Sequence, residues 1–147
     1  MRWKLLNEGP EAAYAIVLAS GDEAMQCLGR WVREHKIDAG SLTAIGAFER
    51  AVLGYFDWSK KDYKRIPVEE QVEVLSLIGD VAVSEGKPTL HLHAVLGKSD
   101  GTTVGGHLLE GHVRPTLEVT LTQPPSYLRK KKDPETGLAL IDIEGSR

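Results

Sequence analysis

The chain has 147 residues and a mass of 16.1 kDa, which is the size of one ordinary domain. A formal net charge of −3 and a pI near 6.0 argue against a duplex-binding protein, because neutralising phosphates usually requires a basic face. The sequence contains no apolar run long enough to span a membrane, and the charged and proline residues near its start do not fit a signal peptide. One cysteine, Cys27, cannot form an internal disulfide. We therefore expect a single cytoplasmic domain over residues 1–147.

Two strands and a helix are predicted first. RWKLL (2–6) and AYAIVLA (13–19) are typical of strands, and NEGPEA between them is typical of a turn. Residues 20–36 predict the main helix, because Ser20 and Glu23 have the spacing of a capping box. Apolar residues then recur at intervals of three and four positions, which predicts one face packed on the core: Ala24, Met25, Leu28, Trp31, Val32 and His35.

The rest of the chain predicts mainly strands. Residues 41–57 are apolar and β-branched, and residues 72–83 form a nearly continuous apolar run, typical of a strand buried on both faces. Residues 114–122 alternate between apolar and polar, and 138–143 suggest a closing strand. The polar segment 58–65 is expected to be a hairpin tip or a loop, and 123–137 is expected to be a loop. The predicted fold class is α+β, with a mostly antiparallel sheet of about seven strands and one main helix packed on it.

Three of the five histidines fall within the seventeen residues HLHAVLGKSDGTTVGGH (91–107). Ser99-Asp100-Gly101 suits a three-residue hairpin loop whose last position is left-handed, where glycine has no steric cost. That loop pairs Lys98 with Thr102 and sets His93 directly opposite His107. His91 lies two residues away on the same face. A two-residue turn at Asp100-Gly101 would instead send His107 to the other face.

The opposite face of this hairpin supports the first register. Its residues are apolar on both strands, so the same pairing that gathers the histidines also produces a dry face under the helix: Leu90, Leu92, Ala94, Leu96, Val104 and Leu108.

Three clustered neutral imidazoles are good ligands for a divalent metal, and zinc is the expected one. The predicted metal ligands are therefore His91, His93 and His107. Glu118 is a candidate fourth ligand or outer partner, and Glu110 and His112 are further candidates beside an expected turn at Gly111. In the alternative interpretation the histidines belong to a polar sheet face or a subunit contact. Cys27 is interpreted as a packed thiol.

Residues 72–122 carry features of a known family: E-[IVL]-L-S-L-x-G at 73–79, H-x-H at 91–93 and D-G-x-x-x-G-G-H at 100–107. With them, nearly the whole chain resembles the PPC (plants and prokaryotes conserved) domain, in its stand-alone prokaryotic type. The resemblance implies an α+β fold, a homotrimer and a metal site whose histidines map onto His91, His93 and His107. Plant members carry AT-hook arms of the type Arg-Gly-Arg-Pro, which this sequence lacks.

Three functions remain open at this stage. The first is a trimeric metal-binding domain whose catalytic role, if any, is undefined. The second is a regulatory module that contacts DNA or another protein, although the basic segments 60–65 and 129–132 are interpreted as solvated loops. The third is a small-molecule pocket at a subunit boundary, built from Arg114 and the close-approach glycines Gly105 and Gly106.

Overall fold

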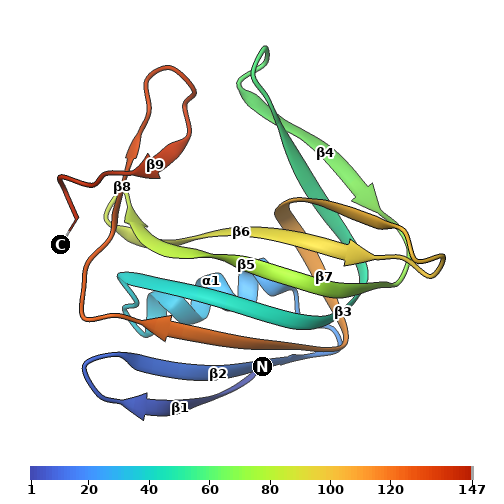
Figure 1. Cartoon of the computed structure of the whole chain (residues 1–147), viewed down its shortest axis with the longest axis horizontal. Helices are drawn as coiled ribbons and strands as arrows, with labels where there is room; N and C mark the ends of the chain where they lie inside the picture. Colours follow the sequence, from blue (N-terminus) through green and yellow to red (C-terminus); the bar gives the residue numbers. More distant parts are fainter. Residues whose placement is uncertain (147) are drawn as a thin grey trace.

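The structure, a computed structural model, describes residues 1–146, without the side chains of Trp3, Leu6, Asn7 and Glu8. In chain order its elements are β1 (Arg2–Glu8), β2 (Ala12–Ala19), α1 (Ala24–Glu34), β3 (Ala39–Asp57), β4 (Asp62–Val68), β5 (Val72–Ser84), β6 (Lys87–Gly97), β7 (Thr103–Gln123), β8 (Arg129–Lys132) and β9 (Ala139–Ile141) (Figure 1).

All of these strands belong to one sheet. Its main path runs β1-β2-β7-β3-β5-β8-β9, β4 pairs with β3, and β6 pairs with both β5 and β7. Strands β3, β5, β6 and β7 therefore close a ring of hydrogen-bonded neighbours. Every pairing is antiparallel except the short parallel contact between β5 and β8. Helix α1 packs against β6 and β7 (Figure 1).

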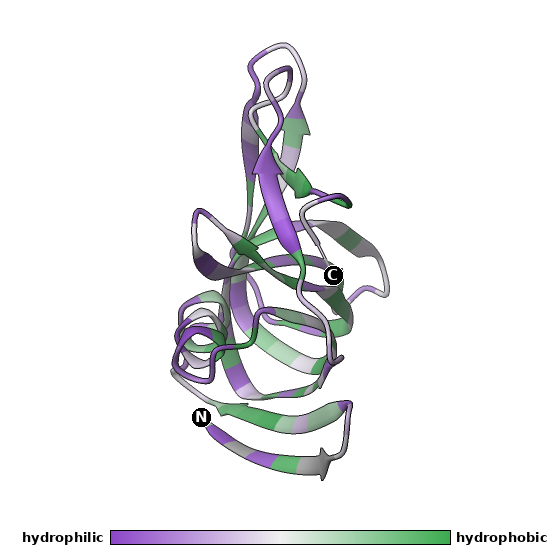
Figure 2. Cartoon of the chain, turned by 90° about the vertical axis from the view of Figure 1, so that its left-hand side faces the viewer, coloured by the Kyte–Doolittle hydropathy of each residue, from purple (hydrophilic) through white to green (hydrophobic). Residues whose placement is uncertain are grey.

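The predicted α+β class, with one helix on a mostly antiparallel sheet, is confirmed, but the sheet has nine strands instead of about seven. The two basic segments account for much of the difference, because β4 begins within the expected hairpin tip or loop and β8 forms within an expected loop. β4 pairs with the C-terminal part of β3, from Ala51 to Asp57, and β8 pairs with the last residues of β5. β4 thus forms a hairpin with the preceding strand, whereas β8 pairs with a strand far away in the sequence, and in both cases pairing overrides a polar local sequence. Figure 2 shows the β3–β4 and β8–β9 hairpins extending from the same end of the molecule.

The core lies between α1 and the inner face of the sheet. The predicted apolar face of the β6–β7 hairpin is confirmed: Leu92, Ala94, Leu96 and Leu108 are buried, and Leu90 and Val104 pack partly buried against them. The helix presents its predicted stripe to the same core. Its start differs from the prediction, because α1 begins at Ala24 and Glu23 is the capping residue, while Ser20 Oγ donates to the carbonyl of Pro115.

The prediction that residues 72–83 are buried on both faces is wrong for the chain by itself. Leu75 and Ile78 of β5 are each 54% exposed on the outer side of the sheet, away from α1. Ile45 of β3, at 62%, and Val95 of β6, at 42%, are exposed on that side too. We call these four residues the outer apolar strip. The described part of the chain contains no helix with the length and apolar character needed to cross a membrane.

The Glu23 side chain ties the helix to the sheet. Its carboxylate accepts hydrogen bonds from the amides of Met25 and Gln26 in the first helical turn, and from the amide of Gly111 in β7. Glu23→Ala removes all three hydrogen bonds at once, so we expect the free energy of unfolding to fall by roughly 1–3 kcal/mol. Urea denaturation measures it. Glu34→Ala, at the exposed far end of α1, is the control, and equal stability of the two variants would contradict this role.

Candidate metal centre

The turn between β6 and β7 has the predicted three-residue form. Gly101 is left-handed, with φ 81°, and its amide donates to the carbonyl of Lys98 at 3.0 Å. The Lys98 amide donates to the carbonyl of Thr102 at 2.9 Å, which closes the loop. Asp100 Oδ1 accepts from both the amide and the hydroxyl of Thr102. These contacts fix the loop length.

The register follows from that turn. His93 pairs with His107, Ala94 with Gly106 and Leu96 with Val104. The alternative two-residue turn, which would place His107 on the opposite face, is therefore not adopted. The predicted gathering of three imidazoles on one face is confirmed.

The imidazoles of His91, His93 and His107 form a compact cluster. One ring nitrogen of each lies within 4.8 Å of the others, and Nε2 of His91 is 3.1 Å from Nε2 of His93. Ligand nitrogens about 3.3 Å apart are expected around a tetrahedral metal with bonds of about 2.0 Å. Small rotations of the rings would therefore bring all three nitrogens to one ion.

Burial disfavours the charged form of His107 and His93. The His107 ring stacks on Tyr63 with centroids 4.6 Å apart, and its buried Nδ1 has no hydrogen-bond partner among the described residues. Burial, followed by the nearby His91 and His93, lowers the pKa of His107 to about 4. Burial and His91 also lower the pKa of His93. Neutral imidazoles and an unsatisfied buried nitrogen both fit a metal site.

An ion pair that the sequence did not predict lies behind His91. Asp80 pairs with His91 across β5 and β6, and its Oδ2 lies 3.6 Å from Nδ1 of His91. Its Oδ1 is 2.6 Å from Nζ of Lys130 in β8. Burial raises the pKa of Asp80, but the contacts with His91 and Lys130 outweigh it, and the net pKa lies below its ordinary value. A carboxylate at this place can hold the His91 ring with Nε2 toward the cluster.

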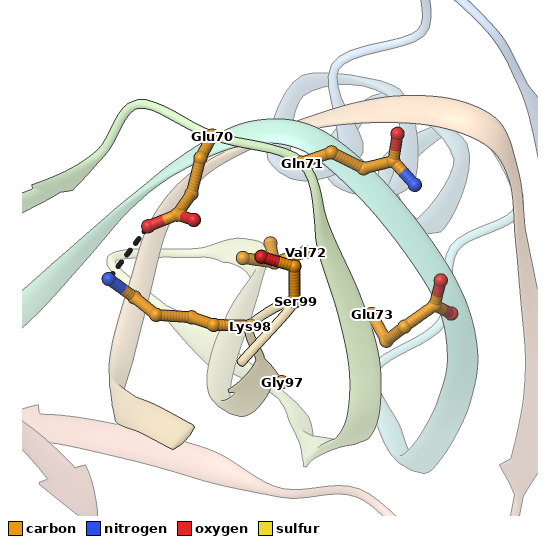
Figure 3. A pocket seen from close by; sticks show the side chains of 7 residues that line it. All are labelled: Glu70, Gln71, Val72, Glu73, Gly97, Lys98 and Ser99. Atoms are coloured by element: carbon orange, nitrogen blue, oxygen red, sulfur yellow. Dashed lines mark ion pairs between the residues drawn. The ribbon is translucent and has the colours of Figure 1, made fainter. Parts of the chain in front are cut away.

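Two hollows flank the histidines. A cavity of about 170 Å³ lies between His91, His107, Tyr63 and residues 138–140 of the C-terminal hairpin. A more open groove of about 420 Å³ lies along β3 and β5 beside His91 and His93, and includes Ile78 of the outer apolar strip. A third cleft, of about 460 Å³, shares no residue with the cluster; the ion pair between Lys98 and Glu70 crosses it (Figure 3).

The other predicted ligands lie elsewhere. Glu118 lines a separate groove with Ile45 and Leu75 and is not part of the histidine cluster. His107 pairs with Gly54 of β3, whereas Glu118 pairs with Ile45, nine positions away. At about 3.3 Å per residue this is roughly 30 Å along a strand. Glu118 is therefore excluded as a ligand of this cluster.

Glu110 and His112 belong to a surface charge network. Glu110 forms an ion pair with Arg65, and His112 contacts both Glu110 and Arg50. The expected turn at Gly111 is wrong, because Gly111 lies inside the continuous strand β7. Neither side chain is in the cluster.

The pocket predicted at a subunit boundary from Arg114, Gly105 and Gly106 stays a prediction about an assembly of copies. Arg114 is exposed beside Glu49. A Cβ on Gly105 or Gly106 would press on the carbonyls of Ala94 and Gly54, which belong to the neighbouring strands β6 and β3. The two glycines permit close strand packing inside the sheet.

This geometry coincides with a family match. Residues 6–124 match the family model described as the Plants and Prokaryotes Conserved (PCC) domain. The chain belongs to this family, also written PPC. The predicted resemblance is confirmed, and the match includes all three clustered histidines but ends before β8.

Three proteins that are similar to this chain have different descriptions. A metal-containing protein of Archaeoglobus fulgidus is 32% identical, with a TM-score of 0.82 over 96% of both chains. A candidate DNA-binding protein of Bacteroides thetaiotaomicron is 26% identical, with a TM-score of 0.86 over 97% of this chain and 98% of that one. The bifunctional protein GlmU of Synechococcus sp. (strain JA-3-3Ab) is 32% identical over 95% of this chain, which spans only 22% of that protein.

The low pKa of His107 predicts a pH-dependent stability in the presence of a chelator. The unfolded chain takes up the proton near the ordinary value of 6.5, whereas folded His107 does so at about 4. The unfolded state therefore binds more protons between these values, and the free energy of unfolding should fall as the pH drops from about 6.5 to about 4. Denaturant unfolding across this range measures the slope. His107→Phe keeps a ring against Tyr63 and should show a shallower slope; parallel curves would contradict the assignment.

Proposed function

We propose that the protein binds a divalent metal ion, zinc by preference, through His91, His93 and His107. The observation that carries this proposal is the gathering of three imidazoles whose ring nitrogens lie within 4.8 Å of one another. Neutral nitrogen ligands on a rigid sheet suit Zn²⁺. The metal-containing protein of Archaeoglobus fulgidus, at 32% identity, supports the same interpretation.

Three protein ligands leave a coordination position free for water or a small ligand. A bound zinc ion supplies Lewis acidity there and lowers the pKa of coordinated water toward neutrality. Within the chain, Asp80 lies 3.6 Å behind His91, and Tyr63 stacks on one side of His107. A rigid, partly buried site of this kind suits ligand binding, and no reaction is assigned to it.

The proposed assembly is a homotrimer. The outer apolar strip exposes large apolar side chains of β3, β5 and β6 to water. Burying them against another copy of the chain would stabilise the assembly. Grooves beside Ile45, Leu75 and Ile78 offer space for the side chains of a neighbour. That the assembly has three subunits is what the family resemblance implies.

The alternative of a DNA-associated module is less well supported by the charges. Arg65, in the first basic segment, pairs with Glu110, and Lys130, in the second, pairs with Asp80. The side chain of Lys130 is only 4% exposed, so its charge faces the interior and does not reach a phosphate backbone. What favours the alternative is the similarity to the Bacteroides protein.

The metal proposal predicts that substituting histidines of the cluster removes the metal, whereas substituting a histidine outside the cluster does not. Protein purified without added chelator should contain close to one equivalent of metal per chain, and His91→Ala/His93→Ala should contain almost none, because one remaining imidazole is a weak site. Elemental analysis by plasma mass spectrometry measures both. His112→Ala, outside the cluster, is the matched control and should keep its metal. Equal, near-zero metal in wild type and double variant would rule the site out.

The trimer proposal predicts a change in mass. Light scattering coupled to gel filtration should give the wild type three times the mass of the 16.1 kDa chain. Ile45→Lys/Leu75→Lys places two charges on the outer apolar strip and should shift the mass toward the monomer. Ile143→Lys, at an 80% exposed position of the C-terminal segment, is the control and should leave the mass unchanged. A monomeric wild type would contradict the assembly.

A further inference from the structure

The cavity of about 170 Å³ beside the histidines is completed by a part of the chain that the family match does not include. The match ends at residue 124, whereas Lys130 and residues 138–140 form one wall of the cavity. The opposite wall consists of His91, His107 and Tyr63. The C-terminal hairpin thus turns an open histidine cluster into a partly enclosed site.

The lining of this cavity is mainly apolar and includes one cationic side chain. Leu90, Leu138 and Leu140 line it together with the ring of Tyr63. Lys130 also lines it, although its side chain is only 4% exposed. A lysine is seldom buried to this extent without a partner, and Asp80 is the acceptor that its ammonium contacts among the described residues. An ammonium group has three N–H donors, and this one ion-pair contact cannot use them all.

The charges around the cavity come close to cancelling before a metal binds. Lys130 and Asp80 compensate each other, and imidazoles that bind a metal ion are neutral. A divalent ion on the three histidines adds two positive charges to this partly buried place. The surrounding leucines cannot compensate them, so an anion is the complementary ligand.

The size of the cavity limits that anion. An engineered apolar cavity of about 150 Å³ is known to hold benzene. A space of about 170 Å³ therefore suits a carboxylate with a compact apolar body of similar bulk. A nucleotide or a sugar phosphate is much larger and does not match these apolar walls.

We propose that this cavity binds a small monocarboxylate, with its charged end toward Lys130 and the three histidines and its apolar body against Tyr63, Leu138 and Leu140. The proposal rests on the proposed metal binding, because the charge that attracts the anion is largely that of the ion. It adds a ligand class and assigns a function to the C-terminal hairpin.

Calorimetric titration of the full-length, zinc-loaded protein tests the proposal, with sodium benzoate as the probe and benzyl alcohol as its uncharged counterpart. We expect benzoate to bind at least about tenfold more tightly than benzyl alcohol, since a hydrogen bond to a charged group has this order of effect. Lys130→Met should weaken benzoate binding about tenfold or more. Lys131→Met, the exposed neighbour on β8, should leave it unchanged.

A second variant tests the cavity without touching the ion pair. Leu138→Trp fills the space and should abolish benzoate binding while the zinc content, measured on every sample, stays at the wild-type level. Wild type without zinc would contradict the metal proposal itself. Wild type that holds zinc but binds no benzoate, binds it equally well after zinc removal, or binds it unchanged in Lys130→Met would overturn the carboxylate site alone.

Discussion

The left-handed conformation of Gly101 is the constraint on which the histidine site depends. It allows a three-residue loop between β6 and β7, and the loop length decides which residues face each other across the hairpin. Since strand side chains alternate, one residue more or less in the loop would turn His107 away from His91 and His93. The same pairing places the leucines of both strands in the core, so core packing and the site favour one register.

The face that carries the histidines also carries the outer apolar strip. Val95 follows His93 by two positions on β6, and Ile78 pairs with His93 across β5. The histidines on this surface must be accessible to an ion, whereas its apolar side chains are more stable when they are covered. In the structure these are separated, with the cavity toward the C-terminal hairpin and the open groove along β3 and β5.

The β6–β7 hairpin was predictable because its turn and its alternating pattern lie close together in the sequence. Features that depend on how longer stretches of strand pair were not predictable in this way. Gly101 and the alternating leucines lie within a few residues of the histidines, so the sequence contained both the register and the cluster. Asp80 was missed because the register of the β5–β6 hairpin, in which Ser84 pairs with Lys87 and Asp80 with His91, was not counted from its turn. A polar residue after Gly79 in an apolar strand was the available signal. Glu118 was misplaced because β7 is one long strand that pairs with different partners along its length.

Lys130 illustrates why a charged segment is ambiguous until its partner is known. Within RKKK (129–132) four cations look alike, and solvation was the natural interpretation. Parallel pairing with the end of β5 turns one of them inward to Asp80, while its neighbours Lys131 and Lys132 remain exposed. A buried ammonium costs free energy unless an anion compensates it. Asp80 meets that requirement and contacts His91 as well, so the ion pair couples the position of the C-terminal hairpin to the orientation of an imidazole in the cluster.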